Sequence, residues 1–416
     1  MASATALTAK EAGASPAEAP ASFALPQPRR ASIDAYRGFV MLLMLMECLH
    51  LWEVKKHVPD APWAEWLAFH TTHVAWNGCS LHDMIQPSFS FLVGVALSFS
   101  VLKRKETGEP WRTSAIHAAL RSLLLIWWGI LLRSLGDDHR ITYFTFEDTL
   151  TQIGLGYFAL FLLSSLGQRW LWAAFAAILV GTWSAFVLYQ PPADFSFERV
   201  GVPADWPEHA TGWAAHWNKN ANLAWAADLS FLNAYPRQQD FEYNSGGYAT
   251  LSFVPTLATM LLGLIAGHWL RGEPKSWQPV IAFVAIGAVL LGAGRALNDF
   301  SICPIVKRVW SPSWVLFSGG WCFLILAAFH AATDAIGLAG WSYPLRVIGS
   351  NLILIYTIAE LPLREFLNAQ FTKHLPKGAW NAFGPQHATI FQGAVWLVCC
   401  WLLLWWLHRK KLFLRL

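Results

Sequence analysis

The chain has 416 residues, of which 55% are hydrophobic and only 13% are charged, with 25 tryptophans and 27 phenylalanines. Soluble domains carry about 25% charged residues, so this composition excludes a large soluble core and indicates an integral membrane protein. The net charge of +4 is small, and the basic residues stand in short runs beside apolar segments. This pattern is typical of topology signals and argues against nucleic-acid binding.

Residues 1–30 are rich in Ala, Pro, Ser and Glu and contain no apolar run. We interpret them as a disordered N-terminal tail and not as a cleavable signal peptide. The first apolar segment then serves as an uncleaved signal anchor. Residues 31–416 are predicted to form one membrane domain.

Apolar stretches of about 20 residues, the length that crosses a bilayer, recur along the chain. The sequence predicts an all-α, polytopic membrane protein with about ten transmembrane helices. We place them near 36–54, 84–102, 114–135, 149–166, 169–189, 249–270, 277–296, 313–333, 343–362 and 388–408.

Basic residues orient these spans, because lysine and arginine concentrate in cytoplasmic loops. They stand before the first span, in the connections after the second, fourth, sixth and eighth spans, and after the last span. Both termini are therefore predicted to be cytoplasmic, in an inner (cytoplasmic) membrane. The exceptions on the outer side are Lys55, Lys56, Lys307 and Arg308.

Two long connections face outward in this topology, residues 55–83 and 190–248. The second is rich in Trp, Tyr, Asn and Pro. Aromatic rings interleaved with amides suit a sugar, which has apolar faces and hydroxyl groups. An interfacial tryptophan belt explains the same pattern equally well.

Two clusters of polar residues stand out at the membrane boundary, where such groups are usually functional. Asp34 and Arg37 are three residues apart in S-I-D-A-Y-R-G, so they share a helix face and can pair. His73 and Asp83 both stand before an apolar helix, at its start. His73 suits a general base or an acylated intermediate, and Asp83 could orient its ring. His70 and His82 are nearby alternatives that spacing does not exclude.

A third group of polar residues lies within predicted spans: His117, Arg121, Gln152 and Asn351. They could line one internal cavity or simply hydrogen-bond neighbouring helices. The six cysteines form no C-x-x-C pair, so we expect no metal site. A disulfide between Cys79 and Cys303 is left open.

Two segments, S-I-D-A-Y-R-G at 32–38 and the stretch from His73 to Gly94, resemble motifs of the heparan-α-glucosaminide N-acetyltransferase family. Its pattern is S-L-D-x-x-R-G followed by H-A-x-W-x-G and D-x-x-F-P-x-F-x-F-x-x-G, and here Gln86-Pro87 replaces Phe-Pro. Weaker similarities occur at 150–157, 246–263, 307–315 and 349–360. The resemblance covers almost the whole membrane part, is weak in 190–245 and is absent from the tail.

The resemblance implies a ten-span fold that transfers an acyl group from cytoplasmic acyl-CoA, such as acetyl-CoA, to an amino or hydroxyl group of a sugar or glycan on the outer side. By motif, His73 corresponds to the family's essential histidine, with Asp83 and Asn351 near the site. No metal and no nucleic acid are expected. The acceptor, the acyl length, acyl-histidine against direct transfer, and the oligomeric state, a homodimer included, remain open.

Coenzyme A carries several phosphate charges, so it needs a cationic rim. We expect Arg37, Arg121 and Arg346 to bind it together with Gln152, and Arg104 and Arg112 are further rim candidates. For acceptor binding or oxyanion stabilisation the candidates are Asp34, Trp76, Asn77 and Asn351.

Two other functions fit the sequence. A proton-coupled transporter of a glycan or lipid-linked precursor would use the same His and Asp groups as a relay. A subunit of an envelope polysaccharide machine with an inactive site is the third reading.

Overall fold

The computed structural model describes residues 30–135 and 140–414. The predicted tail therefore lies outside the described residues except for Arg30. The described part is helical, and its one β-type contact is an isolated bridge between Asn77 and Val306. The all-α prediction is confirmed for these residues.

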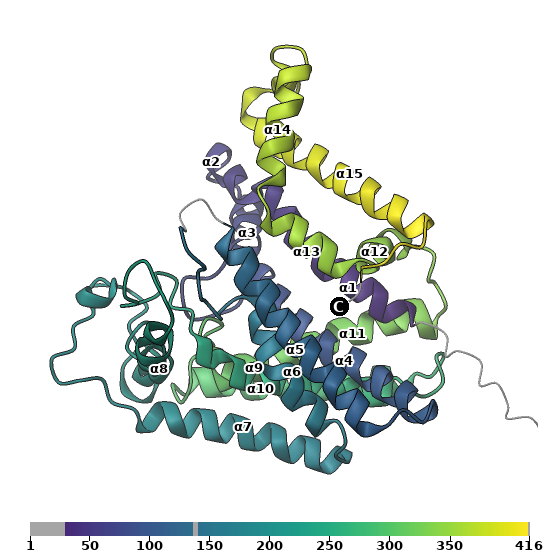
Figure 1. Cartoon of the computed structure of the whole chain (residues 1–416). Coiled ribbons are helices and arrows are strands. Elements are labelled where there is room, and N and C mark those ends of the chain that lie inside the picture. The colour runs from purple at the N-terminus through teal and green to yellow at the C-terminus, as the bar shows by residue number, and fades with distance from the viewer. Residues whose placement is uncertain (1–29, 136–139, 415–416) are drawn as a thin grey trace, which may run out of the picture.

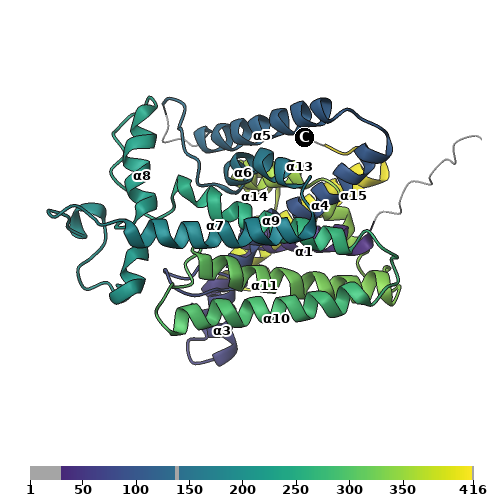
Figure 2. The same ribbon diagram turned by 90° about the horizontal axis from the view of Figure 1, so that it is seen from below.

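The described residues form fifteen α-helices, which Figures 1 and 2 show from two sides. Their bounds are α1 (Ala31–Leu45), α2 (Val54–His57), α3 (Pro62–His70), α4 (Ile85–Glu106), α5 (Trp111–Ser134), α6 (Thr149–Leu163), α7 (Gln168–Leu188), α8 (Leu223–Phe231), α9 (Phe253–Trp269), α10 (Gln278–Asp299), α11 (Pro312–Phe329), α12 (Tyr343–Gly349), α13 (Leu352–Glu360), α14 (Leu363–His374) and α15 (Ala388–Arg409).

Seven helices within the described residues are long and apolar enough to cross a membrane: α4, α5, α7, α9, α10, α11 and α15. The chain is thus a multi-pass membrane protein. The other three predicted spans are helical but shorter. α1 and α6 have 15 residues each, and the ninth span is divided into α12 and α13. The count of about ten spans and the cytoplasmic position of the termini stay predictions.

The ninth span is divided because Asn351 leaves the helical conformation, with φ −133° and ψ 53°. Proline at the start of α12 and the extended Leu361 after α13 limit these helices further. Broken helices at membrane depth are tolerated where they border a cavity. This break does so, because Gly349 and Ser350 line the large cavity described below.

The central helix of the bundle is α9, which is buried along most of its length. α4 packs against it at close range. A Cβ atom on Gly94 would lie 1.9 Å from the Met260 carbonyl oxygen, and one on Gly263 would lie 1.8 Å from that of Phe91. Small residues at such crossings let helix backbones approach in membranes.

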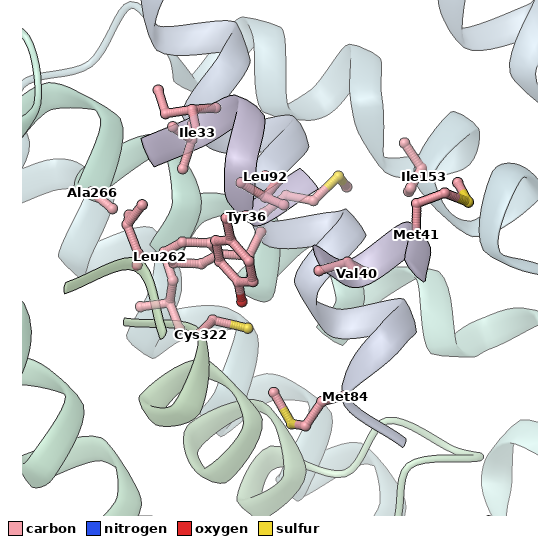
Figure 3. Close-up of a cluster of buried hydrophobic side chains, with 14 of the residues drawn as sticks. Ile33, Tyr36, Val40, Met41, Met84, Leu92, Ile153, Leu262, Ala266 and Cys322 are labelled. Atoms are coloured by element: carbon pink, nitrogen blue, oxygen red, sulfur yellow. The ribbon is translucent and has the colours of Figure 1, made fainter. Parts of the chain in front are cut away.

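The main core joins α1, α4, α6, α9 and α11. Figure 3 shows Tyr36, Val40 and Met41 of α1 among Leu92, Ile153, Leu262, Ala266 and Cys322. The buried Tyr36 hydroxyl donates a hydrogen bond to Ser88 Oγ over 2.9 Å. α5, α7 and α10 instead expose large apolar side chains, such as Leu123, Val180 and Val289, as expected of lipid-facing helices.

The long connection around α8 gathers at one end of the bundle, at the left of Figures 1 and 2. The start of α1 lies at the opposite end, at the right of both views. The two ends of the molecule therefore differ in character, with folded connections at one and the first residues of α1 at the other. This polarity positions the site residues.

Candidate functional site

His73 and Asp83, the pair singled out by sequence, are in direct contact. Nδ1 of His73 lies 2.7 Å from Oδ1 of Asp83. The Asp83 side chain is 1% exposed and the His73 side chain 39% exposed. Because Nδ1 is engaged by the carboxylate, the ring presents Nε2 as its free nitrogen, which is the arrangement of an oriented base.

The turn before α4 fixes Asp83 by reciprocal hydrogen bonds. Oδ2 of Asp83 accepts from the backbone N–H and the hydroxyl of Ser80, at 3.1 and 3.0 Å, and from the backbone N–H of Val74 at 3.2 Å. The Asp83 N–H donates to Ser80 Oγ over 3.2 Å. This is a capping-box arrangement, and the spacing S-x-x-D is its sequence signal, which our reading missed.

The two nearby histidines take different places. His70 Nδ1 accepts a hydrogen bond from the Leu81 N–H over 3.1 Å, so it closes the loop that carries His73. The His82 ring packs against the His73 ring with centroids 4.5 Å apart, and His82 is 9% exposed. Neither contacts Asp83 as His73 does, which favours His73 as the reactive histidine.

A residue that sequence reasoning missed completes this cluster. Lys307 Nζ lies 3.2 Å from Oδ1 of Asp83 and 3.2 Å from Nδ1 of His73. It is 224 residues from Asp83 in the chain, so spacing could not reveal it. The one sequence signal was its exceptional position, a basic residue on the predicted outer side.

Trp76 and Asn77 hold the His73 loop against neighbouring connections of the chain. Trp76 is 2% exposed, and its indole N–H donates to the Trp217 carbonyl over 3.1 Å. The Asn77 side-chain oxygen accepts from the Ile305 N–H over 3.0 Å. Both side chains are thus committed to the fold, and their predicted role toward acceptor or oxyanion gains no support from these positions.

The aromatic and amide residues of 190–248 largely build a second core. Trp217 is fully buried and Trp225 nearly so. Asn222 caps α8 by accepting from two backbone N–H groups, and Asn220 donates to the Val200 and Asn244 carbonyls. Trp213 remains 56% exposed. Most of the residues that suggested sugar binding are therefore structural.

A cavity of about 1130 Å³ lies between α1, α4, α5, α6, α12 and α13. It follows α4 from Phe89 to Glu106, which is roughly 25 Å at 1.5 Å per residue. Apolar side chains such as Met41, Val93 and Ile353 line its inner part. Its size and lining suit a long ligand with an apolar section.

Cationic side chains gather on the walls of this cavity. They include all three arginines predicted to bind the cofactor, Arg37, Arg121 and Arg346, and Arg30 and Lys103 line the cavity as well. Asp34 lines the same cavity and pairs with Arg37, 3.5 Å away, as its spacing predicted. Asp34 therefore belongs to this cavity and not to the His73 cluster.

The guanidinium groups of Arg121 and Arg346 offer hydrogen-bond donors to an anionic ligand in the cavity. Nε of Arg121 and Nε of Arg346 are buried without a hydrogen-bond partner among the described residues. Arg121 also lies over the Tyr157 ring, 5.0 Å from its centroid. Buried N–H donors that lack acceptors are costly, and phosphate oxygens would satisfy them. The residues present therefore fit a phosphate-bearing co-substrate.

Gln152 and Asn351 lie elsewhere. The Gln152 amide donates to the Phe146 and Thr250 carbonyls, at 2.6 and 3.1 Å. The Asn351 side chain binds the C-terminal segment, donating to the Leu412 carbonyl and accepting from the Leu414 N–H. Among the described residues, neither lines the cavity or contacts His73. Their predicted roles gain no support from these positions.

The cavity and the His73 cluster are connected through α4. Phe89 lines the inner end of the cavity, and Asp83 stands six residues earlier, about 9 Å along a helix axis. His73 itself is not among the described residues that line the cavity. The cluster thus lies just beyond the inner end of the cavity.

The described residues contain no group of three His, Cys, Asp or Glu side chains that could hold a metal ion. All six cysteines are free thiols, so the Cys79–Cys303 disulfide that was left open is absent. Cys303 is buried in the second core, and burial raises the pKa of its thiol to about 11.

No family model matches the chain. The chain is 24% identical to the heparan-alpha-glucosaminide N-acetyltransferase of Homo sapiens and 22% identical to that of Mus musculus. Each alignment covers 94% of this chain. The chain is thus similar to these two acetyltransferases along almost its whole length. The resemblance seen in the motifs is thus confirmed. The aligned region covers 60% and 62% of the length of these two acetyltransferases.

Proposed function

We propose that this chain is a member of the heparan-α-glucosaminide N-acetyltransferase family and that it moves an acetyl group from acetyl-CoA, bound on the cytoplasmic side, to an amino or hydroxyl group of a sugar on the outer side. One observation carries the proposal. A long cavity with arginines on its walls follows α4 and ends near an oriented His–Asp pair.

The arginines explain how the donor would be held. Phosphates of coenzyme A would accept from the guanidinium groups of Arg37, Arg121 and Arg346. In the part of the chain that the structure describes, the buried Nε atoms of Arg121 and Arg346 have no hydrogen-bond partner. The pantetheine arm is slim and largely apolar, so it suits the inner lining formed by Met41 and Val93. The thioester would then lie toward the Phe89 end of the cavity, near His73.

His73 would supply the proton chemistry. As the acceptor's nitrogen or oxygen attacks the thioester carbonyl, Nε2 of His73 takes the acceptor's proton. The C–S bond then breaks, and the same proton passes to the departing sulfur to give free coenzyme A. Asp83 holds the ring in place through Nδ1. Only the acetyl group crosses the membrane in this scheme.

The polarity of the molecule supports a transfer from one side to the other. The arginine-lined cavity reaches the end of α4, at Glu106, whereas His73 lies in the loop that packs against the second core. With the orientation indicated by the basic residues, the first end is cytoplasmic and the second faces outward. We place the protein in the inner (cytoplasmic) membrane on the same basis.

The first test is enzymatic and uses the purified chain in detergent. We expect it to release coenzyme A from acetyl-CoA when glucosamine is supplied as the probe acceptor. His73→Ala should abolish this release without changing the melting temperature. His57→Ala, an exposed histidine on α2, should retain full turnover. Full turnover by the His73→Ala protein would exclude His73 from the reaction.

A further inference from the structure

Lys307 lies in the connection between α10 and α11, and its ammonium group reaches both members of the His73 pair. Nζ is 3.2 Å from Oδ1 of Asp83 and 3.2 Å from Nδ1 of His73. The Lys307 side chain is 6% exposed. A buried ammonium group is costly unless it is paired, so this residue is held there by its carboxylate partner.

The backbone around Lys307 is fixed on both sides. The Gly78 N–H donates to the Ile305 carbonyl over 2.9 Å, and the Asn77 side chain accepts from the Ile305 N–H. On the other side, the Arg308 guanidinium donates to the Val74 carbonyl over 3.2 Å. The loop that carries His73 and the segment that carries Lys307 therefore move as one unit.

The charged and titratable groups around His73 come from these two segments. Asp83 and Lys307 contact it directly, and the His82 ring packs on its face. The others close to the cluster are His70, which is bound to the Leu81 N–H, the thiol of Cys79, and the guanidinium of Arg308. Asp83 is the one carboxylate that contacts His73 among the described residues.

We propose that Lys307 is a positioning residue of the His73 site, which pairs with the Asp83 carboxylate and offsets its negative charge beside the His73 ring. This inference rests on the proposed function for its purpose. A lone carboxylate beside an imidazole favours the imidazolium form. The ammonium group of Lys307 opposes that effect, because it lies as close to Nδ1 as to the carboxylate.

This arrangement matters for the proposed transfer because only uncharged His73 can take the acceptor's proton. Once it has done so, the imidazolium faces the positive charge of Lys307 and the negative charge of Asp83 together. The proton is then held weakly enough to pass to the departing sulfur. Without Lys307, the Asp83 charge beside the ring is no longer offset, so we expect the reaction of His73 to require a higher pH.

The test measures the charge of His73 without any acyl-CoA. Diethyl pyrocarbonate modifies uncharged imidazole, and mass spectrometry locates the product on His73. The midpoint is the pH at which the rate of His73 modification reaches half its maximum. In Lys307→Gln, this midpoint should rise by about one unit. Lys307→Arg, which keeps the charge, should stay within a few tenths of a unit. Lys55→Met, which removes an exposed lysine on the same side, serves as the matched control.

An unchanged midpoint in folded Lys307→Gln would overturn the proposal, whatever its effect on stability. Should that variant not fold, the double variant D83N/K307Q leaves no buried charge. Its midpoint should lie close to that of the unmodified protein, since the two charges offset each other. A displacement of a full unit in the double variant would contradict the assignment.

Acetyl-CoA turnover, measured separately on the same proteins, keeps the two proposals apart. With Lys307→Gln, the acid limb of kcat/KM against pH should move upward together with the modification midpoint. If the unmodified protein shows no turnover but the midpoint moves, the proposed function fails and the electrostatic role of Lys307 stands. Turnover with an unmoved midpoint rejects Lys307 alone.

Discussion

Asp83 is the residue on which the His73 site depends most. It accepts hydrogen bonds from its own loop and contacts His73 and Lys307 at the same time. Removing one partner of a buried ion pair costs about 3–5 kcal/mol, because the other charge is left without compensation. The pair therefore links the stability of this loop to the orientation of His73.

Asp228 of α8 provides a pH-dependent test of the outer region. Burial raises its pKa to about 6, against 3.8 for a free side chain. The folded state thus favours the protonated carboxyl, and stability should be greatest below pH 3.8 and decline as the pH rises to about 6. The difference between these two pKa values corresponds to a loss of at most about 3 kcal/mol in the free energy of unfolding above pH 6.

We therefore expect Asp228→Asn to raise the melting temperature at pH 7.5 and to leave it nearly unchanged at pH 4. The amide oxygen can still accept from the Thr250 N–H, as Oδ2 does now over 2.9 Å. Asp240→Asn, at an exposed position, is the control in a thermal-shift series across pH. An equal effect of Asp228→Asn at both pH values would show that this carboxyl is not the titrating group.

At the level of residues, sequence reasoning found pairs that are close in the chain and missed the partner that is distant. Asp34–Arg37 and His73–Asp83 are three and ten residues apart, and both contacts are present. Lys307 joins the second pair through the folding of another connection, which no spacing rule describes. The amides of Gln152 and Asn351 satisfy nearby backbone groups, the common role of buried amides in membrane helices.

α4 packs on α9 at close range in the bundle that positions the site. Both helices approach through glycines, and a methyl group on Gly263 would lie 1.8 Å from the Phe91 carbonyl oxygen. We expect Gly263→Ala to destabilise the protein by about 3 kcal/mol, because backbone atoms cannot yield as a flexible side chain can.

Recovery of monodisperse protein and its melting temperature measure this effect. Gly181→Ala on α7 is the matched control, since a methyl group there meets nothing within 4 Å. It should be neutral or slightly stabilising, because alanine favours the helix. Equal stability of the two variants would contradict the close crossing of α4 and α9.

The break between α12 and α13 places Arg346 at the cavity. Arg346 Nη2 donates to the Ala339 carbonyl over 3.3 Å, while its Nε lacks a partner among the described residues. If this group binds phosphate, Arg346→Ala should weaken coenzyme A binding roughly 10- to 100-fold, the value of about 1.5–3 kcal/mol expected for a charged hydrogen bond.

Titration of purified protein with coenzyme A, followed by calorimetry, measures the affinity. Arg295→Ala removes an arginine that pairs with Asp299 at the other end of the bundle, so it should bind as the unmodified protein does. Equal affinities for the Arg346→Ala and Arg295→Ala proteins would place the phosphates elsewhere.

For the whole molecule, composition and apolar length predicted a multi-pass helical protein, and the structure agrees. The number of full-length helices could not be predicted, because a 20-residue apolar stretch does not reveal where a helix ends. α1 stops at Leu45 and continues as a tighter turn, and Asn351 interrupts the ninth stretch. Both shortened segments line the cavity, so the helices that depart from full length are among those that border the candidate binding site.

The position of the second core was also beyond the sequence. Trp76, Trp217 and Val306 come from three separate connections and pack together. The aromatic and amide residues of 190–248 suggested ligand binding, yet most of them are buried and have a structural role. The whole molecule presents a cationic cavity that follows α4 and an oriented histidine beyond the Phe89 end of that cavity.

In the proposed transfer, coenzyme A stays on one side of the membrane and the acetyl group reaches an acceptor on the other side at His73. The most direct test of this transfer uses proteoliposomes with labelled acetyl-CoA outside and glucosamine trapped inside, since coenzyme A cannot cross a bilayer. We predict labelled acetylglucosamine in the lumen with the unmodified protein and none with His73→Ala. Labelled product formed only when glucosamine is also outside, or glucosamine efflux without acetyl-CoA, would contradict the account.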